Sequence, residues 1–153
     1  MNFTSLNHLK TDCFLLNIWL PFYMKSIIVV LGVFIFSIFV EGFIRIIVLF
    51  YHKTEFTFWG VSSLPSPGWA VALVIASLLI YWLSGMLVVT ATMYSPKKHL
   101  LSLGMLLLLL KGSEVLQTYS IEPMWYLIMI LSSPFIGLYL AYYTHSKIHE
   151  KNS

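Results

Sequence analysis

Charged residues are scarce in this chain of 153 residues. Only 10% of the residues are Asp, Glu, Lys or Arg, whereas a typical soluble domain has about a quarter, and 59% are apolar. Such a chain cannot cover an internal core with a water-facing surface, so the composition excludes an ordinary soluble domain. The mean hydropathy of +0.85 predicts that the lipid bilayer surrounds a single membrane-embedded domain.

The residues that most often carry chemistry are also few. The single cysteine, Cys13, excludes an internal disulfide and a multi-cysteine metal site. The five histidines lie at the ends of the apolar runs or in the terminal segments, so no buried histidine pair is available for haem: His8, His52, His99, His145 and His149. The sequence has no HExxH motif, no Walker loop and no GxGxxG motif. We therefore expect no metal, no cofactor and no enzymatic activity.

The positive charge of the chain is spread out. The net charge is +3, and the nine Lys and Arg residues occur in ones and twos without forming a basic stripe. Nucleic-acid-binding proteins gather such residues on one face. We therefore expect no nucleic-acid partner.

Four apolar runs of about 20 residues predict transmembrane helices at residues 27–51, 69–94, 99–119 and 124–144. Proline, glycine and short polar turns separate them, in Ser62–Gly68, Ser95–Lys98 and Ser120–Pro123. The expected fold is all-α, a four-helix transmembrane bundle within residues 24–147. Lys111 and Glu114 interrupt the apolar run of the third span, which crosses the bilayer only if the helix continues through residues 111–119.

The lysines predict the orientation of the bundle. Six of them fall on one side of the four-span arrangement: Lys10, Lys25, Lys97, Lys98, Lys147 and Lys151. The other side has Lys53, with Arg45 near a helix end. Because cytoplasmic loops of membrane proteins are enriched in Lys and Arg, both termini are predicted to be cytoplasmic.

The two terminal segments differ from the membrane domain. Residues 1–23 contain a short apolar patch that Asn17 and Pro21 interrupt, and they lack a signal-peptide cleavage site. We interpret them as a leader or an interfacial segment, and Met24 followed by Lys25 as an alternative translation start. Residues 148–153 are expected to form a polar tail.

The first span carries two charges, Glu41 and Arg45, which lie four residues apart and so share one helical face with Ser37. Arg45 is close enough to the helix end for its side chain to reach the surface, whereas Glu41 lies about 14 Å from that end. Lys111 and Glu114 of the third span fall at a similar depth. The sequence leaves three interpretations open: a neutral ionic network that fixes helix register, a protonatable carboxylate on an ion path, or a position of Lys111 and Glu114 in interfacial water.

Small residues predict close helix packing in the fourth span. Ser133, Gly137 and Ala141 form a ladder with a spacing of four, and Pro134 is expected to kink the helix. The ladder favours packing within the bundle, with dimerisation or a hinge as alternatives. Ala72 and Ala76 form a weaker ladder in the second span, and Gly112 offers another point of close approach.

Several short motifs carry a resemblance. They include Met24-Lys25 before the first span, Pro67-Gly68-Trp69, the turn Lys97–His99 followed by Leu100–Gly104, and Trp125-Tyr126 before Ser133-Pro134 in the last span. With them, residues 24–147 resemble small four-span integral membrane proteins of bacteria. The resemblance implies a multi-pass protein of the bacterial inner membrane, but it implies no activity, substrate or catalytic residue.

Two classes of function follow as hypotheses. The first is a non-enzymatic protein that packs with a second copy or another membrane protein and stabilises an assembly in the bilayer. The alternative is a small transporter or channel subunit in which Glu41 and Glu114 form a proton or cation site. A dry, paired Glu41 would favour the first class, and a cavity reaching Glu41 would favour the second.

Overall fold

The structure, a computed structural model, describes residues 4–52, 56–57, 60–61, 66–92 and 95–151, and side chains within 24–48, 50–51, 66–92 and 95–148. It contains the helices α1 (Thr4–His52), α2 (Pro67–Ala91), α3 (Pro96–Thr118) and α4 (Met124–Lys151). Two-residue strands β1 (Phe56–Thr57) and β2 (Gly60–Val61) pair antiparallel between α1 and α2. All four helices are long and apolar enough to cross a membrane, which confirms the predicted all-α four-helix bundle.

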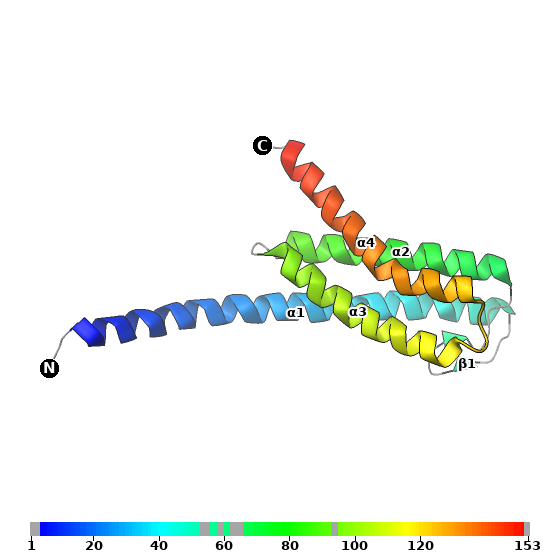
Figure 1. Ribbon diagram of the computed structural model, residues 1–153, viewed down its shortest axis with the longest axis horizontal. Coiled ribbons are helices and arrows are strands. Elements are labelled where there is room, and N and C mark those ends of the chain that lie inside the picture. Colours follow the sequence, from blue (N-terminus) through cyan, green and yellow to red (C-terminus); the bar gives the residue numbers. More distant parts are fainter. Residues whose placement is uncertain (1–3, 53–55, 58–59, 62–65, 93–94, 152–153) are drawn as a thin grey trace.

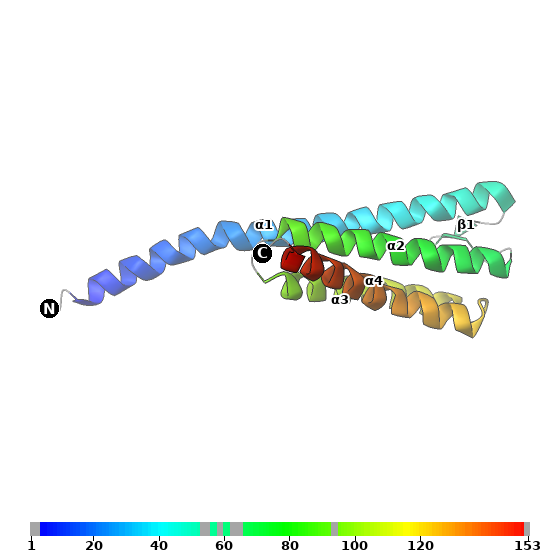
Figure 2. The ribbon, with the colours of Figure 1, turned by 90° about the horizontal axis from the view of Figure 1, so that it is seen from above.

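The four helices are arranged around α2 and α3. Figure 2 shows α2 between α1 and α4, and α3 touches the other three helices. Figure 1 shows that the N-terminal part of α1 runs beyond the ends of the other helices. Prolines stand at the beginning of three helices, as Pro67 of α2, Pro96 of α3 and Pro123 directly before α4. Proline suits these positions because the first helical residues have no intrahelical acceptor for an N–H group.

Two helices extend further than the sequence indicated. α1 continues through Asn17 and Pro21, the two residues that interrupt the apolar patch, because a proline removes one backbone hydrogen bond without having to end a helix. α4 continues to Lys151, so residues 148–151 of the predicted polar tail prolong the helix. The predicted end of the second span, at residues 93–94, lies outside the described residues.

The closest contact between helices lies between α2 and α4. A Cβ atom at Gly137 would lie 2.7 Å from the Cβ atom of Tyr81, and one at Gly85 would lie 2.5 Å from that of Ala141. Both glycines are therefore needed for the observed distance between the helices. Gly137 and Ala141 of the predicted ladder thus contact α2, where Gly137 lies against Tyr81 and Ala141 lies against Gly85. Ala72, from the weaker predicted ladder, is exposed.

The third member of the ladder, Ser133, supports the backbone of α4 beside Pro134. Pro134 lies inside the helix and has no N–H group to donate to the carbonyl of Ile130. The buried Ser133 hydroxyl donates to this carbonyl instead, at 2.7 Å. α4 changes direction along its length (Figure 1), as expected for a proline-containing helix.

The buried apolar residues form two clusters at different depths of the bundle. One contains Val30, Val33, Val88, Leu103 and Leu107, with others, and the second contains Val48, Leu73, Val74, Tyr126 and Ile130, with others. Along α1 the stretch between Val33 and Val48 carries the predicted charges, and along α3 they follow Leu107. A polar layer therefore separates two apolar layers.

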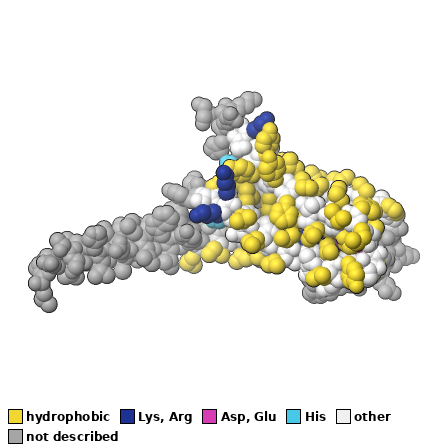
Figure 3. Space-filling view, viewed as in Figure 1, with side chains coloured by type: hydrophobic (Ala, Val, Ile, Leu, Met, Phe, Trp, Pro, Cys, Tyr) yellow, Lys and Arg dark blue, Asp and Glu magenta, His cyan; other side chains and the backbone are white. Residues whose placement is uncertain are grey.

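The outer surface is largely apolar, as a lipid environment requires. Figure 3 shows hydrophobic side chains over most of one face, with lysine side chains gathered at one end. The exposed lysines among the described side chains are Lys25, Lys97, Lys98 and Lys147. They belong to the beginning of the α1 span, the beginning of α3 and the last turns of α4. These positions lie at the same end of the bundle because α1 and α3 run opposite to α4.

Candidate functional site: a buried charge quartet

The charged residues of the predicted first and third spans meet in the centre of the bundle. We call Glu41, Arg45, Lys111 and Glu114 the charge quartet. Relative to full exposure, Lys111 is 1% accessible, and Glu41 and Glu114 are each 6% accessible. The interpretation that Lys111 and Glu114 lie in interfacial water is therefore wrong. The apolar residues on both sides of this layer exclude a solvated position.

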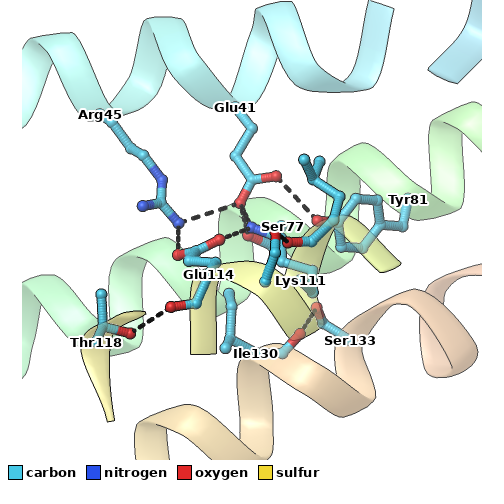
Figure 4. Close-up of polar contacts among 11 residues, drawn as sticks. Glu41, Arg45, Ser77, Tyr81, Lys111, Glu114, Thr118, Ile130 and Ser133 are labelled. Atoms are coloured by element: carbon cyan, nitrogen blue, oxygen red, sulfur yellow. Dashed lines mark hydrogen bonds and ion pairs between the residues drawn. The ribbon is translucent and has the colours of Figure 1, made fainter. Parts of the chain in front are cut away.

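The quartet is a closed set of ion pairs between α1 and α3 (Figure 4). Lys111 Nζ donates to Glu41 Oε1 and, at 2.7 Å, to Glu114 Oε2. Arg45 Nη2 donates to Glu114 Oε1 and lies 3.5 Å from Glu41 Oε1. Each cation thus contacts both carboxylates, and the formal charges of the quartet sum to zero.

Glu41 has further partners on α2. The Tyr81 hydroxyl donates to Glu41 Oε2 at 2.9 Å, and the Ser77 hydroxyl donates to Glu41 Oε1 at 3.2 Å. Both oxygens of Glu41 therefore accept hydrogen bonds, and this residue joins three helices. Ser77 and Tyr81 were not predicted from the sequence to be partners of Glu41. Their spacing of four residues, continued three residues later by Ser84, places them on one face of α2 and was the available signal.

Arg45 behaves differently from the expectation. Its side chain is only 13% exposed and turns inward to Glu114, so the prediction that it reaches toward the membrane surface is wrong. The reason is geometric: α1 continues to His52, about 10 Å of rise beyond Arg45, while a carboxylate lies within contact on α3. An ion pair in a dry layer is stronger than one near water.

A second polar contact joins α1 and α2 below the quartet. The Oγ atoms of Ser37 and Ser84 lie 2.7 Å apart, and both residues are fully buried. Ser37 donates to the carbonyl of Val33 at 2.8 Å, so Ser84 is the donor in the bond between the two hydroxyls. Ser37 lies one turn before Glu41, and the polar face of α1 therefore faces α2 and α3. His52, at the end of this face, has a side chain outside the described set.

Gly112 was predicted to allow a neighbouring helix to approach closely, and the structure does not show such an approach. A Cβ atom there would meet no neighbour within 4 Å, so the glycine next to Lys111 is not a point of close helix approach. Gly104 has this property to a moderate degree, because a Cβ atom at this position would lie 3.2 Å from Leu138 Cδ1.

Comparisons with known proteins identify no relative, so a proposal for the function has to rest on the chemistry of the site. A scan against protein-family models, a search of curated proteins and a search of solved structures found no match. Within the described side chains, no three His, Cys, Asp or Glu residues are grouped so that they could hold a metal ion. What the quartet offers is a connection between helices with no net formal charge, in which every carboxylate oxygen accepts a hydrogen bond.

Proposed function

We propose that this chain is a non-enzymatic, multi-pass protein of the bacterial inner membrane, with cytoplasmic termini, that serves as a packing or assembly partner. The observation that carries the proposal is the pairing of the quartet. All four carboxylate oxygens accept a hydrogen bond from a cationic group or a hydroxyl. An ion-binding carboxylate has to exchange its partners during each cycle, whereas these are held from three helices.

The energetics favour the same role. A charged residue at the centre of a membrane helix costs about 2.5–3.5 kcal/mol on the insertion scale. Pairing within the bundle offsets this cost only when the helices adopt one register, because a shift of one residue turns a side chain by 100° around the helix. The quartet therefore stabilises one arrangement of α1 against α3, as buried polar groups do in other helical assemblies.

α1 supplies the surface that we assign to a partner. Its polar face turns into the bundle, while Phe39 and Phe43 remain 78% and 63% exposed. Exposed aromatic side chains on a membrane helix face either lipid or another protein helix. A second copy of the chain or another membrane protein is the partner that this proposal requires.

A flux assay separates the assembly role from the transport alternative. We expect the purified wild-type protein in proteoliposomes to carry no protons or common monovalent cations. A wild-type flux that disappears in Glu41→Gln would support the transporter alternative and overturn the proposal. Glu41→Gln is informative because it removes the charge and keeps the shape and most hydrogen-bonding capacity of the side chain.

Crosslinking in native membranes tests the partner surface. In a Cys13→Ser background, Phe43→Cys should give a discrete crosslinked species with a short bifunctional maleimide. The matched control is Leu83→Cys, whose side chain is 49% exposed on α2. Because this reagent joins two thiols, the test addresses a second copy of the chain, and equal crosslinking at the two positions, or none at Phe43→Cys, would contradict the assignment of α1 as the surface for a second copy.

A further inference from the structure

A groove between α3 and α4 lies on the outer surface of the bundle, away from the quartet. Its volume is about 280 Å³. Leu100, Gly104 and Leu108 of α3 line one side, and Leu138 and Tyr142 of α4 line the other. The only charged residue in its lining is Lys97, at one end. The groove is thus lined by apolar residues along its length and has a lysine at one end.

Two features of the chain create the groove. Gly104 lines the groove, and a Cβ atom there would lie 3.2 Å from Leu138 Cδ1, so a side chain at this position would close the space between the two residues. α4 bends, and Figure 1 shows its C-terminal part diverging from the beginning of α3. From Lys97 to Leu108 the groove extends about 16 Å along α3, which is about half of the hydrocarbon thickness of a bilayer. It therefore matches the depth of one lipid leaflet.

The charged end is suited to an anion. Lys97 is exposed, and its Nζ lies 5.4 Å from the centre of the Tyr142 ring, which holds the ammonium group at the mouth of the groove. Lys97 also belongs to the first turn of α3, whose N-cap, Ser95, makes no side-chain hydrogen bond to the helix. The positive end of the helix dipole adds to the charge of the lysine at this point.

We infer that the groove binds one anionic phospholipid, with an acyl chain between α3 and α4 and the headgroup phosphate at Lys97. This inference rests on the proposed membrane location. A second copy of the chain in the same orientation fits less well, because its exposed lysines lie at the same end and would face Lys97. Basic pockets between membrane helices are typical sites for anionic headgroups, and the observed combination of one lysine with an apolar channel has this form.

The experiment measures lipid binding to the full-length protein in mild detergent by native mass spectrometry. Dioleoyl phosphatidylglycerol and dioleoyl phosphatidylcholine have the same acyl chains and differ in headgroup charge. We expect one tightly bound phosphatidylglycerol and weaker binding of phosphatidylcholine. Lys97→Gln should weaken phosphatidylglycerol binding about fivefold, while Lys147→Gln, which removes an exposed lysine outside the groove, should leave it unchanged.

A second pair of variants tests the acyl-chain site. Met105 lines the groove and is 64% exposed, so Met105→Trp should fill it and reduce phosphatidylglycerol binding. Leu109→Trp, at a position that is 72% exposed and outside the lining, is the control. Equal affinity for the two lipids, equal effects of Lys97→Gln and Lys147→Gln, binding of inorganic phosphate alone with the same affinity, or a dimer that blocks the groove would each overturn the inference. Membrane location is tested separately: a wild-type protein released from membranes by alkaline carbonate would refute the proposed function itself.

Discussion

Replacement of Lys111 by methionine would remove the central cation of the quartet. Glu41 and Glu114 would then share one cation, Arg45, and a net negative charge would remain in a layer closed by apolar residues on both sides. Loss of one partner from a buried ion pair typically costs about 3–5 kcal/mol. Methionine has a length and volume close to those of lysine, so little of the effect would come from a cavity.

The loss is large compared with the stability of a typical domain, which is about 5–15 kcal/mol. For a chain of this size, 1 kcal/mol corresponds to about 2–4 °C in Tm. We therefore expect Lys111→Met to lower the Tm by about 10 °C in thermal unfolding followed by circular dichroism in mild detergent. Lys98→Met, an exposed lysine on the same helix, should change the Tm by less than about 2 °C.

A double variant decides whether charge is the cause. Lys111→Met combined with Glu114→Gln restores neutrality, with Arg45 opposite Glu41, and should recover most of the lost Tm. Residues that form one ionic network show such non-additive effects. If the double variant were as unstable as the sum of the two single variants, or if Lys111→Met resembled Lys98→Met, the quartet would not be what stabilises the bundle.

Three further substitutions, two of them with a matched control, test contacts within the bundle by the same thermal measurement. Tyr81→Phe removes a hydrogen bond to a buried carboxylate and should cost about 1.5–3 kcal/mol, whereas Tyr139→Phe, at an exposed position, should be neutral. Gly137→Ala should destabilise the protein because its Cβ atom would lie 2.7 Å from Tyr81, but Gly32→Ala, with open space around it, should stabilise α1 by up to about 1 kcal/mol. Ser84→Ala should cost about 0.6 kcal/mol by removing the bond to Ser37, and a neutral result would show that this bond does not hold α1 to α2.

The helices and the depth of the charges were predictable from the sequence, because both follow from local quantities. Apolar length gives a membrane-spanning helix, and counting 1.5 Å per residue places Glu41 and Glu114 at a similar level. Neighbours across helices depend on how each helix is rotated about its axis. Side chains of leucine and isoleucine project from most sides of α2. The apolar residues of a membrane helix therefore give little information on how the helix is rotated about its axis. The hydroxyls of Ser77, Tyr81 and Ser84 give it, because they have to find partners inside the bundle.

The glycines and Arg45 show why the remaining details were not predictable. Gly85 and Gly137 are each in close contact with a residue of the neighbouring helix, whereas Gly112 is in open space, although all three lie within predicted spans. The difference arises from which face of each helix meets a neighbour. Arg45 was expected to reach outward because its depth alone was considered. The position of Glu114 on another helix determines its direction, and that position is a property of the folded bundle.

The third predicted span provides the last test, since α3 contains two buried charged residues, Lys111 and Glu114, and still has to cross the bilayer. α3 has 23 residues and is about 35 Å long, which exceeds the hydrocarbon thickness of about 30 Å. It can cross because Lys111 and Glu114 neutralise each other and the charges of α1, which is possible only with α1 in place. In a Cys13→Ser background, we expect Ser120→Cys to react with a membrane-impermeant maleimide in intact cells. Ser95→Cys, at the lysine-rich end, should react only after permeabilisation. Labelling of both residues from the same side would show that α3 does not span, and labelling of Ser95→Cys alone in intact cells would reverse the predicted orientation.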